Sequence, residues 1–178
     1  SLKRSDGKVL EGRAILDPAN ERATLSFPET LPVGKAELTV EFSGILNDKL
    51  HGFYRSTYKG ADGQDKPLAS TQFESTDARR AFPCWDEPAL KAVFQVALVV
   101  DEKLTAISNA RVIRETRLEG TGKKEVVFAD SIKMSTYLVA FIVGEFEATE
   151  AVAAAGAPLR VCAVPGKKSL TRFALDIG

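Results

Sequence analysis

The chain has 178 residues, of which 44% are hydrophobic and 27% are charged, a composition typical of one globular domain with a hydrophobic core. Its 24 lysines and arginines balance its 24 aspartates and glutamates. This neutral balance argues against a surface that binds nucleic acid or a membrane. The longest apolar run, Tyr137 to Val143, is far too short to span a bilayer.

Alternation of apolar and polar residues with a period of two predicts strands along most of the chain. Residues 36–44 place Leu38, Val40 and Phe42 on one face, the pattern of a half-buried antiparallel strand. Residues 92–101 are apolar at nearly every position, which predicts a central strand. Further strands are predicted over residues 124–130, 136–146 and 158–164.

The predicted strands are separated by turns rich in glycine, proline and polar residues, at residues 32–34, 44–48, 59–67 and 119–124. Strands with short connections and almost no helix indicate an antiparallel sheet or sandwich. Residues 147–158, which are rich in alanine, are interpreted as a linker. Residues 168–178 carry apolar side chains at helical spacing and predict the start of a helix. We expect the chain to be a piece of a longer protein.

The two cysteines, Cys84 and Cys162, are too few for a disulfide framework and are interpreted as buried free thiols in a reducing compartment. The single histidine, His51, stands in a predicted loop and cannot build a site of several histidines. No Cys-x-x-Cys pair accompanies it. The sequences GTGKK and PGKKS lack the spacing of a phosphate-binding loop.

One segment, STQFESTDARRAFPCWDEPALK from Ser70 to Lys91, concentrates charges, aromatic residues and prolines. If residues 68–74 form a strand, Gln72 and Glu74 point to one side, and Phe73 points to the other side as the core anchor. A carboxylate beside an amide can receive a cationic group through a charge-assisted hydrogen bond. The alternative is an ordinary solvated strand face.

The residues that follow form a second, strongly charged part of this segment. Asp77 could cap a short helical turn over residues 78–82, which Pro83 would end. Two arginines share the loop with Asp86 and Glu87, and the favoured interpretation is an internal salt-bridge network that stiffens the loop. An acid/base pair of Asp86 and Glu87 is the alternative, although adjacent side chains rarely aim at one reacting atom.

The sequence TQFESTDARRAFPCWDEPALKAVF closely resembles a signature of the M1 family of zinc aminopeptidases, nearest to its puromycin-sensitive branch. The resemblance continues in LNDKLHGFYRSTY, SNARVI, KMSTYLVAFIVGEFE and RVCAVPGKKSLTRFALD. It implies an all-β fold, an antiparallel, saddle-shaped sheet or sandwich with little helix. Residues 1–165 would form a partial N-terminal β domain, truncated at its N-terminus, and residues 166–178 would begin the connection to a catalytic domain.

The same resemblance implies roles for two residues. In the family, a Gln-x-Glu pair of the β domain reaches into the active-site cleft, so Glu74 would hold the protonated α-amino group of a peptide substrate. Gln72 would line the pocket for the first side chain. Partners would be the peptide N-terminus and the catalytic domain of the same parent chain, and the branch suggests a cytoplasmic location.

The zinc-binding motif His-Glu-x-x-His of the family is absent, as is its Gly-Ala-Met-Glu-Asn motif. Zinc is therefore expected in the full-length parent, whereas no metal ligand, no catalytic residue and no peptidase activity are expected in this chain alone. Two other interpretations stay open. One is a non-enzymatic β-sandwich module that binds a partner through a sheet edge or the charged loop. The other is a self-contained hydrolase that uses Asp86, Glu87 or Glu74.

Overall fold

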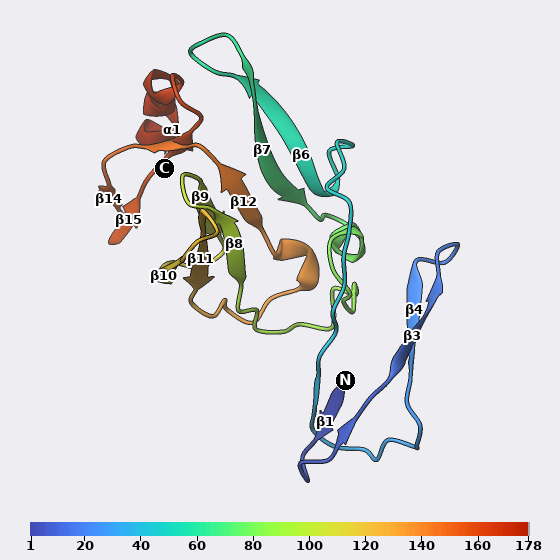
Figure 1. Cartoon of the computed structure of the whole chain (residues 1–178). Helices are drawn as coiled ribbons and strands as arrows, with labels where there is room; N and C mark the ends of the chain where they lie inside the picture. Colours follow the sequence, from blue (N-terminus) through green and yellow to red (C-terminus); the bar gives the residue numbers. More distant parts are fainter. Residues whose placement is uncertain (178) are drawn as a thin grey trace.

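A computed structural model of the chain describes residues 1–177 and shows an all-β protein built from antiparallel sheets, as the alternation predicted (Figure 1). Its strands are, in chain order, β1 (Leu2–Arg4), β2 (Val9–Leu10), β3 (Arg13–Asp17), β4 (Arg22–Ser26), β5 (Ala36–Leu38), β6 (Gly52–Lys59), β7 (Asp65–Gln72), β8 (Ala97–Asp101), β9 (Thr105–Ser108), β10 (Val112–Leu118), β11 (Lys123–Phe128), β12 (Phe141–Gly144), β13 (Glu147–Ala148), β14 (Val152–Ala154), β15 (Ala157–Leu159) and β16 (Cys162–Ala163). The helical segments are the 3₁₀ helices η1 (Ala78–Arg80), η2 (Thr136–Leu138) and η3 (Lys168–Thr171), and the α-helix α1 (Arg172–Ile177).

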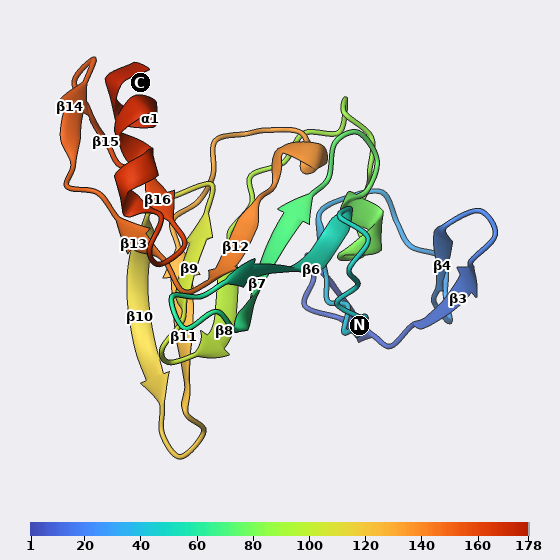
Figure 2. The same cartoon turned by 90° about the horizontal axis from the view of Figure 1, so that it is seen from above.

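Two sheets form the body of the protein, which lies between residues 52 and 144 (Figure 2). One has the strand order β6-β7-β12-β9, and the other has the order β10-β11-β8, with all neighbours antiparallel. A buried apolar cluster joins them, because β8 and β11 contribute Val100, Val126 and Phe128 while β9 contributes Ala106. The two sheets therefore pack as a sandwich, and burial of these side chains stabilises it.

A second apolar cluster lies where the chain leaves β7 and enters η1. Its buried members are Phe73, Ala78, Met134 and Val139. The Phe73 ring meets the ring of Phe141 edge-on, with centroids 6.0 Å apart, and a similar contact of 5.8 Å joins it to Phe82. Edge-to-face contacts of this kind add to the burial energy, so this end of the sheet is firmly packed.

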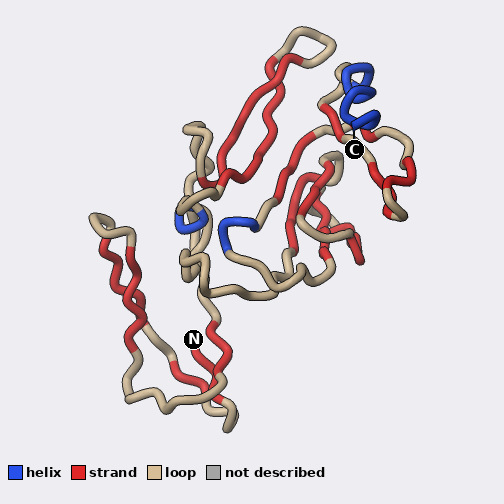
Figure 3. Tube along the Cα trace, turned by 180° about the vertical axis from the view of Figure 1, so that it is seen from behind, coloured by secondary structure: helices blue, strands red, loops and turns tan. Residues whose placement is uncertain are grey.

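Residues 1–50 are organised differently from the body. They contain the small sheet β2-β1-β5 and the separate hairpin β3–β4, and an extended segment connects them to β6 (Figures 1 and 3). Only Leu2 and Leu10 are buried within this range. Every residue of β3 and β4 is exposed apart from Ser26 at the end of β4, which is half-buried. The hairpin therefore has no hydrophobic layer beneath it.

Two predicted strands differ from those observed because at least one apolar face of each has no opposing layer. The strand expected over residues 36–44 ends at Leu38, and Phe42 is exposed. The strand expected to be central over residues 92–101 begins only at Ala97. It is the edge of its sheet, paired with β11 alone, and Val99 is exposed. An apolar run shows that burial is favourable, but it does not show that a second strand is present on each side.

The predicted strands over residues 136–146 and 158–164 are each interrupted. In the first, η2 occupies the start and β12 follows it. In the second, β15 and β16 are separated and pair with different strands, β14 and β13. The prediction of strand was thus right in type but wrong in extent.

Residues 147–158 are not the linker that their composition suggested. They contain β13 and the hairpin strand β14, which pairs with β15. The two-residue turn between β14 and β15 has Ala155 at φ 48° and Gly156 at φ 84°, the left-handed conformations that favour tight hairpins. The predicted C-terminal helix is confirmed as η3 followed by α1.

Candidate functional site

The Gln-Phe-Glu sequence lies at the end of β7, at the firmly packed end of the sheet. Gln72 is the last residue of the strand. Phe73 is only 2% exposed and points into the core, whereas Gln72 and Glu74 are both exposed. The predicted alternation of these three side chains is therefore present.

Glu74 itself stands in a turn rather than in the strand that was predicted to include it. The turn is closed by a hydrogen bond of 2.9 Å that the backbone N–H of Asp77 donates to the carbonyl of Phe73. Ala78, immediately beyond it, is fully buried. Buried residues thus fix the chain on both sides of Glu74, and the exposed carboxylate projects from a constrained segment.

Gly52 allows η1 to close against the sheet beside Gln72. It pairs with Gln72 across β6 and β7 and has φ 70°. A Cβ atom at this position would lie 2.9 Å from the Cβ of Arg80 and 3.6 Å from the carbonyl oxygen of Asp77. Only glycine combines this conformation with such a close approach. The pairing therefore brings the charged loop, residues 77–87, directly alongside the end of β7.

The charged loop contains the internal ion-pair network that the sequence favoured. The Nε of Arg79 lies 2.8 Å from Asp86, whose side chain is only 6% exposed, and the Nε of Arg80 lies 2.6 Å from Asp77. Asp77 does not cap η1 through its side chain, and η1 ends at Arg80 rather than at residue 82. The Asp77 carboxylate instead serves the guanidinium, a stronger charge-assisted partner.

A third carboxylate of this network comes from the tip of the distant β3–β4 hairpin. One oxygen of Glu21 lies 3.0 Å from the Nη2 of Arg80, and the other lies 3.6 Å from the Nη1 of Arg79. Nothing in the local sequence around residue 21 signals a contact so far along the chain, so the sequence alone does not identify Glu21. A cavity between the two parts is lined by Asn20, Glu21, Arg22, Arg79, Cys84 and Asp86.

Two buried hydroxyl groups hold the backbone at the C-terminal end of the charged loop. The hydroxyl of Ser135 donates to the carbonyl of Pro88 at 2.7 Å, and the hydroxyl of Thr136 donates to the carbonyl of Trp85 at 3.2 Å. Both hydroxyl residues are buried, whereas Trp85 is exposed. The loop is therefore anchored through its backbone while its indole stays in solvent.

Glu74 differs from the acidic residues of this region that belong to the ion-pair network. Asp77, Asp86 and Glu21 each pair with an arginine, but within residues 1–177 no lysine or arginine forms an ion pair with Glu74. Glu87 is likewise exposed and unpaired in that range, and Asp86 pairs with Arg79. Glu74 is thus an exposed, unpaired carboxylate two residues after the Gln72 amide, and the arginines of the neighbouring loop already pair with other acids.

Residues 4–138 match the family model described as the peptidase M1 N-terminal domain. The chain belongs to the M1 peptidase family. It is 53% identical over 154 residues to a puromycin-sensitive aminopeptidase of Caenorhabditis elegans, covering 86% of this chain and 16% of that protein. It is 45% identical over 175 residues to aminopeptidase M1 of Arabidopsis thaliana, covering 98% and 20%, and 42% identical over 180 residues to human endoplasmic reticulum aminopeptidase 1, covering 99% and 19%.

This M1 domain thus spans about a fifth of the length of the relatives it matches, and those relatives are named as aminopeptidases. The resemblance to the M1 family and to its puromycin-sensitive members is confirmed. The all-β fold expected from that resemblance is confirmed as well.

The residues of the M1 domain do not fit the zinc ion that the family uses. Among residues 1–177, no three His, Cys, Asp or Glu side chains gather closely enough to hold a metal. His51 is half-buried beside β6, with no second histidine in the sequence. Within the same range, no helix has the length and apolar character needed to cross a membrane.

The two thiols of the M1 domain are both free, as predicted, but they are less buried than expected. Cys162 is exposed on β16, and Cys84 is half-buried in the cavity below the β3–β4 tip. Burial, followed by the nearby Asp86 carboxylate, raises the pKa of the Cys84 thiol to about 11, while Arg79 acts in the opposite direction. Cys84 is therefore protonated at neutral pH and is a poor nucleophile.

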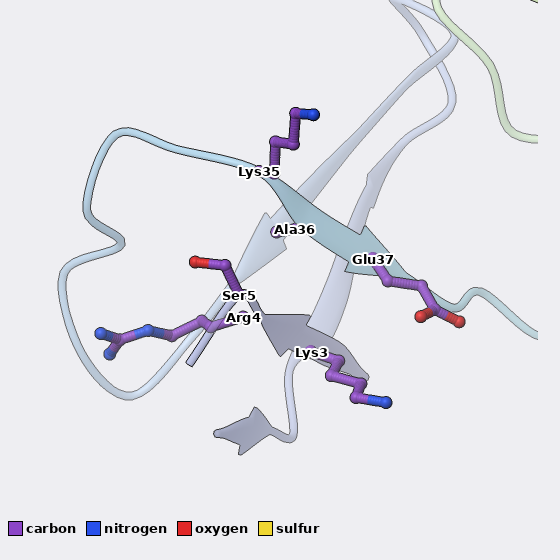
Figure 4. A pocket seen from close by; sticks show the side chains of 6 residues that line it. All are labelled: Lys3, Arg4, Ser5, Lys35, Ala36 and Glu37. Carbon is purple, nitrogen blue, oxygen red and sulfur yellow. The ribbon is translucent and has the colours of Figure 1, made fainter. Parts of the chain in front are cut away.

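A separate hollow lies between β1 and β5 and is lined by Lys3, Arg4, Ser5, Lys35, Ala36 and Glu37 (Figure 4). Lys3 and Glu37 extend to one side, whereas Arg4 and Lys35 point in other directions, so the charged groups do not converge on one point (Figure 4). A ligand site needs a few polar groups that converge, so this hollow is not a candidate site.

Proposed function

We propose that this M1 domain anchors the free amino terminus of a peptide substrate. The Glu74 carboxylate accepts charge-assisted hydrogen bonds from the substrate ammonium, and Gln72 contacts the first side chain. The observation that carries the proposal is an exposed, unpaired carboxylate on a constrained turn, next to arginines that are occupied by other acids. A fixed anchor of this kind sets the position of the first peptide bond.

The partner of the domain in this role is the catalytic domain of the same parent chain, which supplies the zinc ion and the reacting groups. Leu170, Phe173 and Ile177 support a partner at this end of the domain, because each is 72% exposed at helical spacing along η3 and α1. The chain alone is expected to bind rather than to cleave, since the His-Glu-x-x-His motif of the family is absent from its sequence.

Two further expectations stay predictions. The first is that the β domain ends at residue 165, where the connection to a catalytic domain begins. A cytoplasmic location agrees with two free thiols. The relatives nevertheless include proteins named for the mitochondrion and the endoplasmic reticulum.

The test is Glu74→Ala in a full-length M1 enzyme that contains this domain. Removal of the anchor should lower kcat/KM for a simple aminoacyl substrate by about 2 kcal/mol or more, roughly thirtyfold, because a charge-assisted contact is lost. Glu87→Ala is the matched control, since Glu87 is an exposed and unpaired carboxylate of the neighbouring loop. Equal rates for Glu74→Ala and the parent enzyme would remove the anchoring role.

A further inference from the structure

The β3–β4 hairpin reaches the body of the protein through its tip. Its strands are exposed along nearly their whole length and pair only with each other. The ion pairs of Glu21 with Arg79 and Arg80 join the tip to the charged loop. A single side chain thus carries the ion-pair link between a hairpin without a hydrophobic layer and the candidate substrate site.

The tip is built to present Glu21. Asp17 accepts hydrogen bonds from the side chain of Asn20 at 2.7 Å and from its backbone N–H at 3.3 Å, which orders the turn. Glu21 follows with φ 54°. That left-handed conformation is uncommon for residues other than glycine and asparagine. A glutamate at such a position bears a backbone cost, which the ion pairs of its carboxylate with Arg79 and Arg80 partly offset.

The charged groups around η1 show what the Glu21 carboxylate does. Two guanidinium groups, those of Arg79 and Arg80, meet three carboxylates, those of Asp77, Asp86 and Glu21. Glu74 lies one turn ahead of η1 and receives no cation among residues 1–177. Neutralising Glu21 would leave each arginine with one acidic partner fewer, and Glu74 is the nearest unpaired carboxylate in the sequence.

We propose that Glu21 is a positioning residue, which clamps the β3–β4 tip onto the charged loop and keeps Arg79 and Arg80 from pairing with Glu74. The part of this inference that concerns Glu74 rests on the proposed anchoring function. Glu21 touches no substrate in this scheme. It acts by occupying the two cations that would otherwise compete with the substrate ammonium.

Alkylation of Cys84 tests the clamp in the chain itself, because this thiol lines the cavity between the tip and the loop. In a Cys162→Ser background, Glu21→Gln should speed the reaction of Cys84 with iodoacetamide by roughly threefold or more, as the tip opens. Glu21→Asp, which keeps the charge, should give a smaller increase. Glu119→Gln removes an exposed carboxylate from the β10–β11 turn and should leave the rate unchanged.

Glu21→Gly separates the clamp from the strained backbone. Glycine relieves the left-handed conformation but also removes the carboxylate. It should therefore expose Cys84 as much as Glu21→Gln does. An unchanged rate of alkylation in both variants would overturn the clamp, whatever the role of Glu74 proves to be.

The positioning role is tested in the full-length enzyme with a double-mutant cycle. Glu21→Gln should raise KM for an aminoacyl substrate by roughly threefold to tenfold with little change in kcat. The same change in a Glu74→Gln background should have no further effect, because the residue to be protected is gone. An equal effect in both backgrounds, or none in the parent enzyme, would overturn the positioning role. Loss of the Glu74 effect itself would instead count against the proposed function.

Discussion

The strands of residues 1–50 and those of the two-sheet body both carry apolar side chains, with opposite results. In the body, alternation places Val126 and Phe128 in a core between two sheets, each 1% exposed. In the β3–β4 hairpin, alternation places Leu16 and Leu25 on one face, yet Leu16 is 70% exposed. The difference lies in whether a second layer faces the apolar side, and the pattern within one strand does not specify that layer.

The contacts that hold the first 50 residues together are correspondingly polar. Glu29 accepts hydrogen bonds from Lys8 and Arg4, and the Lys8 ammonium holds the pKa of Glu29 below its ordinary value. The tip of the hairpin meets the body through Glu21. Exposed ion pairs contribute far less to stability than buried apolar area does. The free energy of folding therefore comes mainly from apolar burial in the body, and residues 1–50 contribute little to it.

The largest expected effect sharpens this contrast directly. Phe73→Ala removes a ring that is 2% exposed from the cluster beneath the charged loop. The free energy of unfolding should fall by about 3–5 kcal/mol. Leu16→Ala, at an exposed position of the hairpin, should change it by less than about 0.5 kcal/mol. Urea unfolding of both variants provides the comparison, and similar losses would show that the hairpin contributes to the main core.

A smaller effect is expected where the body begins. Gly52→Ala imposes a left-handed conformation on alanine and brings its Cβ to 2.9 Å from the Arg80 Cβ. Gly63→Ala has the same conformational cost, with φ 74°, but no atom lies within 4 Å of the added Cβ.

Thermal unfolding should therefore show a loss of about 1 kcal/mol for Gly63→Ala and about 2–3 kcal/mol for Gly52→Ala, since only the latter must also displace η1. Equal losses would indicate that η1 does not pack tightly on β6, and the charged loop would then lack the fixed position that the candidate site needs.

The smallest effect concerns the cavity where the two regions meet. The pKa of the Cys84 thiol is raised from 9.0 to about 11, chiefly by burial. The folded state then holds this proton more tightly than the unfolded state. Its contribution to stability is complete below about pH 9 and is lost as pH rises towards 11.

Unfolding measured between pH 8 and pH 11 should thus show a slightly steeper loss of stability for the parent chain than for Cys84→Ala. The difference between the two curves isolates Cys84 from the tyrosines and lysines that titrate in the same range. Parallel curves would mean that the thiol is as solvated as in the unfolded chain, and that the hairpin tip does not cover it.

The sequence by itself determined the local features of this protein. The period of two identified the all-β class, and it anticipated a buried Phe73 between the exposed Gln72 and Glu74, although Glu74 already stands in the turn after β7. The crowded arginines and acids predicted their own ion pairs, since the partners lie within one loop. The family signature in the same segment was specific enough to place the chain among the M1 peptidases.

Only the tertiary structure decided which apolar faces are covered and which distant residues meet. In that structure β8 is an edge strand, the alanine-rich residues 147–158 contain a hairpin strand, and Glu21 pairs with Arg80. It also gave Gly52 its contact with η1. These outcomes depend on pairing between segments far apart in the chain. A window of sequence records the preference of each segment for burial, but not the neighbour that satisfies it.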